Sequence, residues 1–164
     1  MYFYIAMKPT KTYTVPEAKR KLEHYCVYQD RCYKEVTNKL REMQMIPIAI
    51  DDILLHLVQH NFLNEERFAK SYARGKFNIK HRGKVRIVRE LKFRNISAYN
   101  IKTALKEIDE GDYLEKLHHL ATKKLASITE ANVYKKRKKI ADYLLYRGWE
   151  SHLVYDKIRE ILPT

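Results

Sequence analysis

The sequence has few of the residues that interrupt helices, because its 164 residues include only four glycines and four prolines. Beyond the first few residues, no segment alternates apolar and polar side chains as a half-buried strand would. The glycines are scattered through the chain, so there is no glycine-rich loop of the kind that cradles phosphates. The composition therefore predicts an all-α fold and argues against nucleotide hydrolysis by this chain.

Cysteine is also scarce. Cys26 and Cys32 have five residues between them and no second cluster, which is not the spacing of a CxxC metal site. We expect two half-buried helix cysteines in a reducing compartment. His56 and His60, with Asp52 one turn earlier, could face one metal ion from a helix, but no third ligand is placed to complete the site. We predict surface histidines, no metal and no cofactor.

Long apolar runs are absent, and the sequence predicts no membrane-spanning helix. The segment from Met1 to Met7 is rich in aromatic residues, but no basic region precedes it and it is too short to cross a bilayer. We therefore expect residues 1–12 to be disordered or to form a short strand, and we expect the protein to be cytoplasmic.

Acidic residues are outnumbered, since 33 Lys and Arg stand against 20 Asp and Glu, a formal net charge of +13. Such an excess implies a polyanionic or acidic partner. It is concentrated between Arg74 and Arg94, where nine basic residues accompany a single acid, Glu90. A second basic cluster covers residues 135–139.

What the sequence does contain is a spacing of apolar residues that occurs three times, in steps of four, five, five and four. A step of four keeps two side chains on one helix face, whereas a step of five does not fit the 3.6-residue turn. Each copy therefore predicts helix, turn, helix. Ser97 is placed to cap the second helix of its copy, and Pro47 suits the first turn of the corresponding helix. The residue before the third position is Gln44, Asn95 or Gly148, and Asn and Gly tolerate the left-handed conformation that ends a helix. The fifteen positions are Val36, Leu40, Met45, Ile50, Leu54, Ile87, Leu91, Ile96, Ile101, Leu105, Ile140, Leu144, Trp149, Val154 and Ile158.

Another amphipathic stretch precedes each of these pairs. The first begins with the capping-box spacing of Thr14 to Glu17, the second with Asn64 as a cap, and the third runs from Tyr113 to Leu125. Each copy is then a three-helix module of roughly fifty residues. We predict an elongated array of three tandem three-helix modules, at residues 13–62, 63–109 and 110–164.

The first basic cluster can be placed on a helical wheel. Ile87 and Leu91 mark the core side, and Arg82, Arg86, Arg89 and Phe93 fall opposite it. A ridge of arginines beside an exposed aromatic ring would suit a phosphate backbone or an acidic protein surface. The alternative is that the Phe93 ring packs under a neighbouring module and the arginines are only solvated.

In the second cluster, Lys136 and Arg137 must lie along the core face, with their charged ends reaching water. The other lysines of this run are better placed for a partner, although a solvated charge run is the alternative. No catalytic residue is predicted. The candidate residues facing a partner or DNA are Lys80, Arg82, Arg86, Arg89, Arg94, Lys135, Lys138, Lys139 and Arg147, with Phe93 as the aromatic contact.

Several motifs together resemble the RecX family of recombinase regulators. The segment 63–69, Leu-Asn-Glu-Glu-Arg-Phe-Ala, resembles the signature of that family. A "G…R-I…E-L…I" stretch and a closing "R-K…Y-L…R-G-F/W" pattern follow, and Tyr25-Cys26, Gln29 and Lys34-Glu35-Val36 resemble its first repeat. The residues that match the two later patterns are Gly83, Arg86, Ile87, Glu90, Leu91, Ile96, Arg137, Lys138, Tyr143, Leu144, Arg147, Gly148 and Trp149.

This resemblance implies three tandem three-helix repeats and a regulator without an active site. Such proteins bind the groove of the RecA filament on single-stranded DNA, suppress its ATPase and strand-exchange activities, and in many cases bind DNA weakly. We therefore predict a monomeric inhibitor of the RecA recombinase, active in the regulation of recombination, DNA repair and the SOS response. The alternative is a basic helical array that binds nucleic acid without a recombinase partner.

Overall fold

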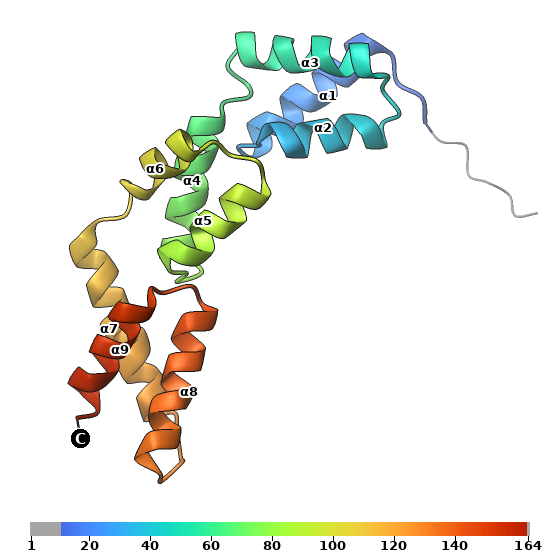
Figure 1. The fold of residues 1–164 in the computed structure, drawn as a ribbon. Coiled ribbons are helices and arrows are strands. Elements are labelled where there is room, and N and C mark those ends of the chain that lie inside the picture. Colours follow the sequence, from blue (N-terminus) through green and yellow to red (C-terminus); the bar gives the residue numbers. More distant parts are fainter. Residues whose placement is uncertain (1–10, 164) are drawn as a thin grey trace, which may run out of the picture. The chain divides into compact units, whose positions relative to one another are not determined.

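The computed structural model describes residues 11–163, which contain nine α-helices and no strand (Figure 1). The all-α prediction is confirmed. The expectation of a disordered or strand-like start falls mainly on residues 1–10, which lie outside the described residues. The helices are α1 (Val15–Tyr28), α2 (Tyr33–Glu42), α3 (Pro47–Gln59), α4 (Glu65–Asn78), α5 (Lys84–Phe93), α6 (Ala98–Leu105), α7 (Glu110–Ala126), α8 (Val133–Tyr146) and α9 (Ser151–Ile161).

The chain divides after Glu65 into two compact units. The first unit holds α1 to α3, and the second holds nearly all of α4 together with α5 to α9. The helices follow one another in threes, as a tandem array of three-helix modules requires. The module boundaries after residues 62 and 109 stay a proposal.

The apolar spacing found three times in the sequence forms the core. Twelve of its fifteen side chains are buried, and the other three, Met45, Leu54 and Leu105, are half-buried. Burial of each such side chain removes apolar surface from water and stabilises the fold by about 1.5–3 kcal/mol. The predicted core positions are therefore confirmed in all three copies.

The turn in each copy has the same conformation. Gln44, Asn95 and Gly148 all have positive φ angles, of 58°, 61° and 91°. The amide of the residue that follows each of them donates to a carbonyl oxygen five residues earlier, at 3.1–3.2 Å, as a helix-ending Schellman motif does. The prediction of a left-handed turn holds even for Gln44, the least suited of the three residue types.

Several predicted helix starts are confirmed. The Thr14 hydroxyl accepts from the Glu17 amide while the Glu17 carboxylate accepts from the Thr14 amide, which completes a capping box on α1. The Ser97 side chain caps α6, and Pro47 occupies the first turn of α3. The Thr14 and Ser97 side chains satisfy amides that a helix start otherwise leaves without a partner, and Pro47 has no amide hydrogen that needs one.

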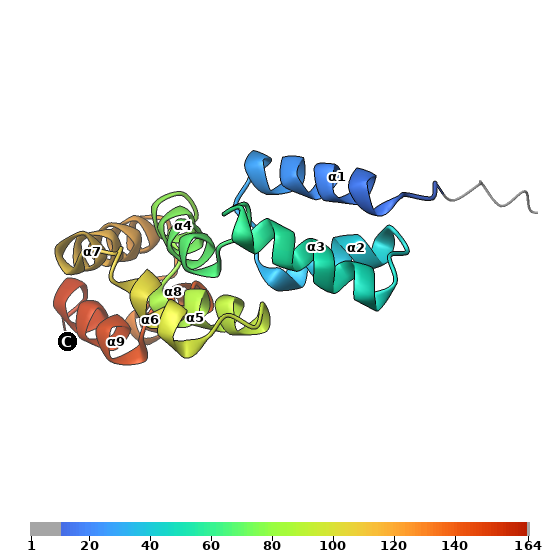
Figure 2. The same cartoon turned by 90° about the horizontal axis from the view of Figure 1, so that it is seen from above.

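In the first unit, α1 and α2 both pack on α3 (Figure 2). Cys26 and Cys32 form no disulfide, and both are buried rather than half-buried. Cys26 belongs to the apolar core of this unit. Burial raises the pKa of the Cys32 thiol. The predicted surface histidine His56 lies 2.6 Å from a Glu23 carboxylate oxygen, and its ring lies 4.3 Å from the ring of His60.

In the second unit, α7, α8 and α9 pack on one another, and α5 packs on α6. The start of α5 meets the turn between α8 and α9, two segments that lie side by side in Figure 1. The Gly83 amide donates to the Arg147 carbonyl and the Val85 amide to the Gly148 carbonyl, both at 3.0 Å. Unpaired amides at one helix start thus satisfy unpaired carbonyls at another helix end. None of the described helices is both long enough and apolar enough to cross a membrane.

Candidate partner-binding surface

The cations that the sequence singled out fall into two groups. Lys80, Arg89 and the three lysines of α8 (135, 138 and 139) are exposed. The remaining four are only partly exposed and contact other parts of the protein. They are Arg82, Arg86, Arg94 and Arg147.

Arg82 does not lie on the helix face on which the wheel placed it. Helix α5 begins at Lys84, after Gly83 in extended conformation and His81 with a φ of 51°. The chain therefore changes direction before the helix starts, and the Arg82 side chain reaches the Glu90 carboxylate. The prediction of three arginines stacked on one helix is wrong for this reason.

Glu90 gathers the basic and aromatic side chains around it, and we call this set the Glu90 cluster. Arg82 Nη1 lies 2.6 and 2.8 Å from its two carboxylate oxygens, and Arg86 Nε lies 3.0 Å from one of them. The Tyr72 hydroxyl donates to the carboxylate at 2.7 Å. Arg94 donates to the Glu90 carbonyl at 2.9 Å and lies over the Tyr72 ring. The only acid of the basic segment thus neutralises part of its charge.

The pKa of Glu90 reflects this setting. Burial by itself raises the pKa, but the hydrogen bonds from Tyr72 and Arg86 and the charge of Arg82 outweigh burial and hold the pKa below its usual range. The pKa of Tyr72 is raised, first by burial and then by its bond to Glu90. The Glu90 side chain is therefore an ionised carboxylate, held by side chains of the same fold.

Arg86 and Arg147 connect the second and third modules within the second unit. Arg86 Nη1 donates to the Tyr146 carbonyl at 3.2 Å, and Arg147 Nη1 donates to the Lys80 carbonyl at 2.9 Å. The two guanidinium groups also lie over the rings of Tyr146 and Tyr143, respectively. Both arginines therefore hold modules together, a role that the sequence analysis did not give them.

Tyr113 is a further residue at this junction that the sequence analysis missed as a contact. Its hydroxyl accepts from the Lys84 amide at 2.8 Å and donates to Glu150 at 2.6 Å, and its ring lies 4.3 Å from that of Trp149. Burial, followed by the bond to Glu150, raises the pKa of the phenol. Its partners are 29 and 37 residues away, so no local pattern could have pointed to them.

Two residues of the predicted arginine ridge, Arg89 and Phe93, lie on the outer face of α5. Arg89 is exposed, and Phe93, one turn later on the same helix, is 72% exposed. The alternative in which the Phe93 ring is covered by a neighbouring module therefore does not describe the structure. A cation and an aromatic ring spaced by four residues on an exposed helix face can contact one partner together.

The second basic cluster lies on α8 as predicted. Lys136 and Arg137 are half-buried, and Arg137 Nη2 donates to the Leu162 carbonyl at 2.7 Å. The other three lysines project into solvent. Lys138 lies 2.8 Å from Asp142, and Lys139 lies 3.8 Å from a Glu130 carboxylate oxygen.

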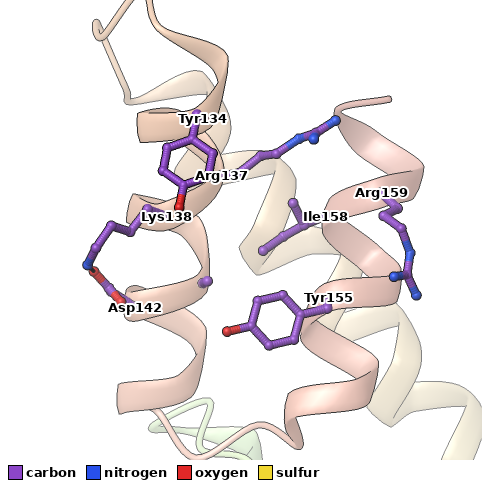
Figure 3. A pocket seen from close by; sticks show the side chains of 8 residues that line it. Tyr134, Arg137, Lys138, Asp142, Tyr155, Ile158 and Arg159 are labelled. Atoms are coloured by element: carbon purple, nitrogen blue, oxygen red, sulfur yellow. Dashed lines mark hydrogen bonds and ion pairs between the residues drawn. The ribbon is translucent and has the colours of Figure 1, made fainter. Parts of the chain in front are cut away.

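A groove of about 550 Å³ lies between α8 and α9 (Figure 3). In Figure 3 the Tyr155 ring extends from α9 toward α8 and the Tyr134 ring lies at α8, and cations of both helices are among the lining residues. Its floor is apolar and its rim is mainly basic. The lining residues are Tyr134, Arg137, Lys138, Ala141, Asp142, Tyr155, Ile158 and Arg159.

Within residues 11–163, no three His, Cys, Asp or Glu side chains gather as a metal site would require. Titratable groups such as Glu90 and Tyr113 are engaged in bonds that hold the fold. What the second unit offers a partner is exposed positive charge, exposed aromatic rings and an open groove.

Two family models match the chain. The one described as the second three-helix domain of RecX matches residues 64–105, and the one described as the third three-helix domain matches residues 110–158. Together they span more than half of the sequence, over the second and third predicted modules.

Curated relatives carry the same name. "Regulatory protein RecX" of Pseudomonas savastanoi pv. phaseolicola is 32% identical over 120 residues, which cover 73% of this chain and 76% of that protein. The protein of that name from Oceanobacillus iheyensis is 24% identical over 141 residues, which cover 86% of this chain and 52% of that protein. The chain thus spans about half the length of the latter relative.

A solved structure shows the same fold. The crystal structure of RecX from Lactobacillus salivarius matches with a TM-score of 0.79 and 26% identity, over 90% of this chain and 96% of that one. Sequence and structure agree on the relationship. The chain belongs to the RecX family of regulatory proteins.

Proposed function

We propose that this protein binds the RecA recombinase filament on single-stranded DNA and inhibits its ATPase, recombinase and strand-exchange activities. The observation that carries the proposal is the kinship with proteins named as RecX regulators, at 32% identity over most of both chains for the Pseudomonas relative. The name of that relative states only that it is a regulatory protein. We take the RecA filament as the partner because the resemblance to the RecX family implies it.

The charge of the chain supports a partner of this kind. A net charge of +13 attracts a nucleoprotein filament over distances of about a Debye length, roughly 8–10 Å at physiological salt. Arg89, Lys80 and the exposed lysines of α8 project from the second unit and are our proposed contacts. We assign Phe93, beside Arg89 on α5, as the aromatic contact.

Regulation in this proposal is by binding alone, without a cofactor, by a monomer acting in the cytoplasm. The groups whose pKa values shift most, Tyr72 and Tyr113, support this view, since their hydroxyls bind carboxylates inside the fold. A hydroxyl held in this way is not poised to attack a substrate.

The test is ATP hydrolysis by the cognate recombinase on single-stranded DNA, measured while this protein is added from substoichiometric to equimolar amounts. We expect hydrolysis to fall as the protein is added. The control is the same titration with the protein heated beyond unfolding. Unchanged hydrolysis, at concentrations where the protein binds the DNA itself, would reject the proposal.

That outcome would instead favour the second candidate, a helical array that binds nucleic acid without a recombinase partner. The feature that favours this alternative is the groove between α8 and α9, which combines exposed tyrosines with cations. A pull-down with the recombinase in the presence and absence of DNA separates the two. A protein that binds only nucleic acid retains the recombinase through shared DNA and loses it when the DNA is absent, whereas the first candidate contacts the recombinase itself.

A further inference from the structure

The groove between α8 and α9 has a counterpart in the second module. A groove of about 510 Å³ is lined by residues of α5 and α6 and by the loop and helix start that follow. The repeat that relates the two modules is a shift of 53 residues, as from Leu91 to Leu144. Four lining positions of one groove fall on four of the other under this shift. The matched pairs are Lys84 and Arg137, Lys102 and Tyr155, Leu105 and Ile158, and Lys106 and Arg159.

The first module does not share this basic lining. A shift of 51 residues, as from Leu40 to Leu91, places Tyr33, Asp51 and two leucines at the four positions. The cations are thus a property of the second and third modules and not of the fold. The α8–α9 groove differs from its counterpart by adding tyrosines, which the counterpart's lining lacks.

The charges around the α8–α9 groove are available to an incoming anion. Lys138 pairs with Asp142, but both side chains are more than 60% exposed. Arg159 pairs with Asp156 in an equally exposed position. Exposed pairs of this kind contribute about 0–1 kcal/mol, so a phosphate group can replace the carboxylate at little cost.

The two tyrosines favour nucleobases over an acidic peptide. Tyr134 is 79% exposed and Tyr155 half exposed, and Figure 3 shows the Tyr155 ring extending from α9 toward α8 and the Tyr134 ring at α8. A peptide carboxylate needs only the cations. Flat rings that stand in solvent beside cations suit a chain that alternates bases and phosphates, since each base can stack on a ring.

We propose that the groove between α8 and α9 binds single-stranded DNA, with Tyr134 and Tyr155 as stacking platforms and Lys138 and Arg159 as phosphate contacts. This inference rests on the proposed function, in which the protein acts where single-stranded DNA is present. It deepens that function by naming the residues that contact the DNA. Arg137 anchors the end of α9 through the Leu162 carbonyl and adds its charge to the groove.

The experiment is fluorescence anisotropy of the full chain, without recombinase, on a labelled oligothymidylate of about 15 nucleotides at about 50 mM salt. The variants are Tyr134→Ala with Tyr155→Ala, and separately Lys138→Gln. The matched controls are Tyr28→Ala, an exposed tyrosine of the first module, and Arg20→Gln. A second probe, an abasic oligonucleotide of equal length, keeps the phosphates and removes the bases.

We expect the tyrosine variant to bind oligothymidylate at least about 5-fold more weakly per ring and to lose the preference over the abasic strand. Lys138→Gln should reduce the slope of log affinity against log salt by about 0.7. Both controls should behave as the wild type. Circular dichroism should show all variants folded, because the changed side chains are exposed.

Three results would overturn the inference. They are no binding of the wild type to either oligonucleotide, equal binding of wild type and tyrosine variant, or a loss as large in Tyr28→Ala. If the tyrosine variant keeps its DNA affinity but no longer inhibits the recombinase ATPase, the groove serves a protein partner instead. Because DNA binding is measured without recombinase, failure here and failure of the proposed function are separate outcomes.

Discussion

Gly83 and Gly148 lie against each other at the junction of the second and third modules. A Cβ atom on Gly83 would lie 2.2 Å from the carbonyl oxygen of Gly148, and one on Gly148 would lie 2.1 Å from Cβ of Arg86. Both distances are far below van der Waals contact. The close approach lets the start of α5 donate its amides to the end of α8.

The change Gly83→Ala should therefore destabilise the protein, by about 2 kcal/mol or more, because backbone must move to admit the methyl group. Chemical denaturation measures the effect. Gly75→Ala is the matched control: it lies within α4 with nothing within 4 Å of the new methyl, and should stabilise by about 0.5–1 kcal/mol. Equal effects of the two changes would contradict the close approach.

Loss of the carboxylate in Glu90→Gln should cost about 1–3 kcal/mol, since Arg82, Arg86 and Tyr72 lose a charged partner in a side chain that is 19% exposed. The pKa of Glu90 is lowered in the folded protein, so its contribution is present above the unfolded pKa of about 4.5 and is lost as the pH falls through the folded value.

Denaturation of wild type and Glu90→Gln at a series of pH values between about 3 and 7 measures this contribution. The difference in stability between the two proteins should be largest near neutral pH and shrink in acid. The other carboxylates are common to both proteins and cancel. A difference that is constant with pH would mean that Glu90 is not ionised in the cluster.

Tyr113→Phe should destabilise the protein by about 1–3 kcal/mol. The hydroxyl is buried and bonded twice, and its removal leaves the Lys84 amide and the Glu150 carboxylate without that partner. Thermal unfolding followed by the fluorescence of the single tryptophan, Trp149, whose ring lies against that of Tyr113 at a tilt of 32°, reports the change directly. Tyr134→Phe, at an exposed position, should stay within about 0.5 kcal/mol of wild type. A similar loss in both variants would argue against the buried bonds.

Charge reversal separates Arg89, which we propose as a partner contact, from the arginines that contact other parts of the fold. Arg89→Glu should leave the unfolding temperature nearly unchanged and weaken binding to the recombinase filament, because Arg89 is exposed on α5. Arg86→Glu should unfold the protein at lower temperature, since it sets a second carboxylate against Glu90. Co-sedimentation with filaments at two salt concentrations measures binding.

Arg20→Glu, an exposed position on α1, makes the same change in net charge and is the control for Arg89→Glu. If both variants lose filament affinity equally, net charge alone drives binding and Arg89 has no particular place in it. If Arg86→Glu is as stable as wild type, the Glu90 cluster does not hold the fold.

Local patterns were enough to predict the helical architecture. The steps of four and five residues identify which side chains share a helix face and where the chain turns, because a helix repeats every 3.6 residues whatever surrounds it. Caps such as Thr14 and Ser97 act within three residues of their own position, and both were found where expected. Even Gln44 adopts the left-handed turn that its position in the repeat required.

The role of each arginine could not be predicted in this way. A helical wheel places Arg82 and Arg86 opposite the core, but it assumes that the helix continues and that the opposite side faces water. The first assumption fails at Gly83, and the second fails because Glu90 and the end of α8 lie within reach of both side chains. Which cations are free to meet a partner depends on these neighbours.

The sequence by itself determined the helices, the core positions, the positive charge and the family, since each of these is recorded in spacings and motifs along the chain. Only the tertiary structure decided which charged side chains are paired within the fold and which are exposed. It also placed Tyr134 and Tyr155 in one groove with cations. The reason is physical: ion pairs, buried hydroxyl bonds and grooves form between residues brought together by packing, over separations that no local periodicity encodes.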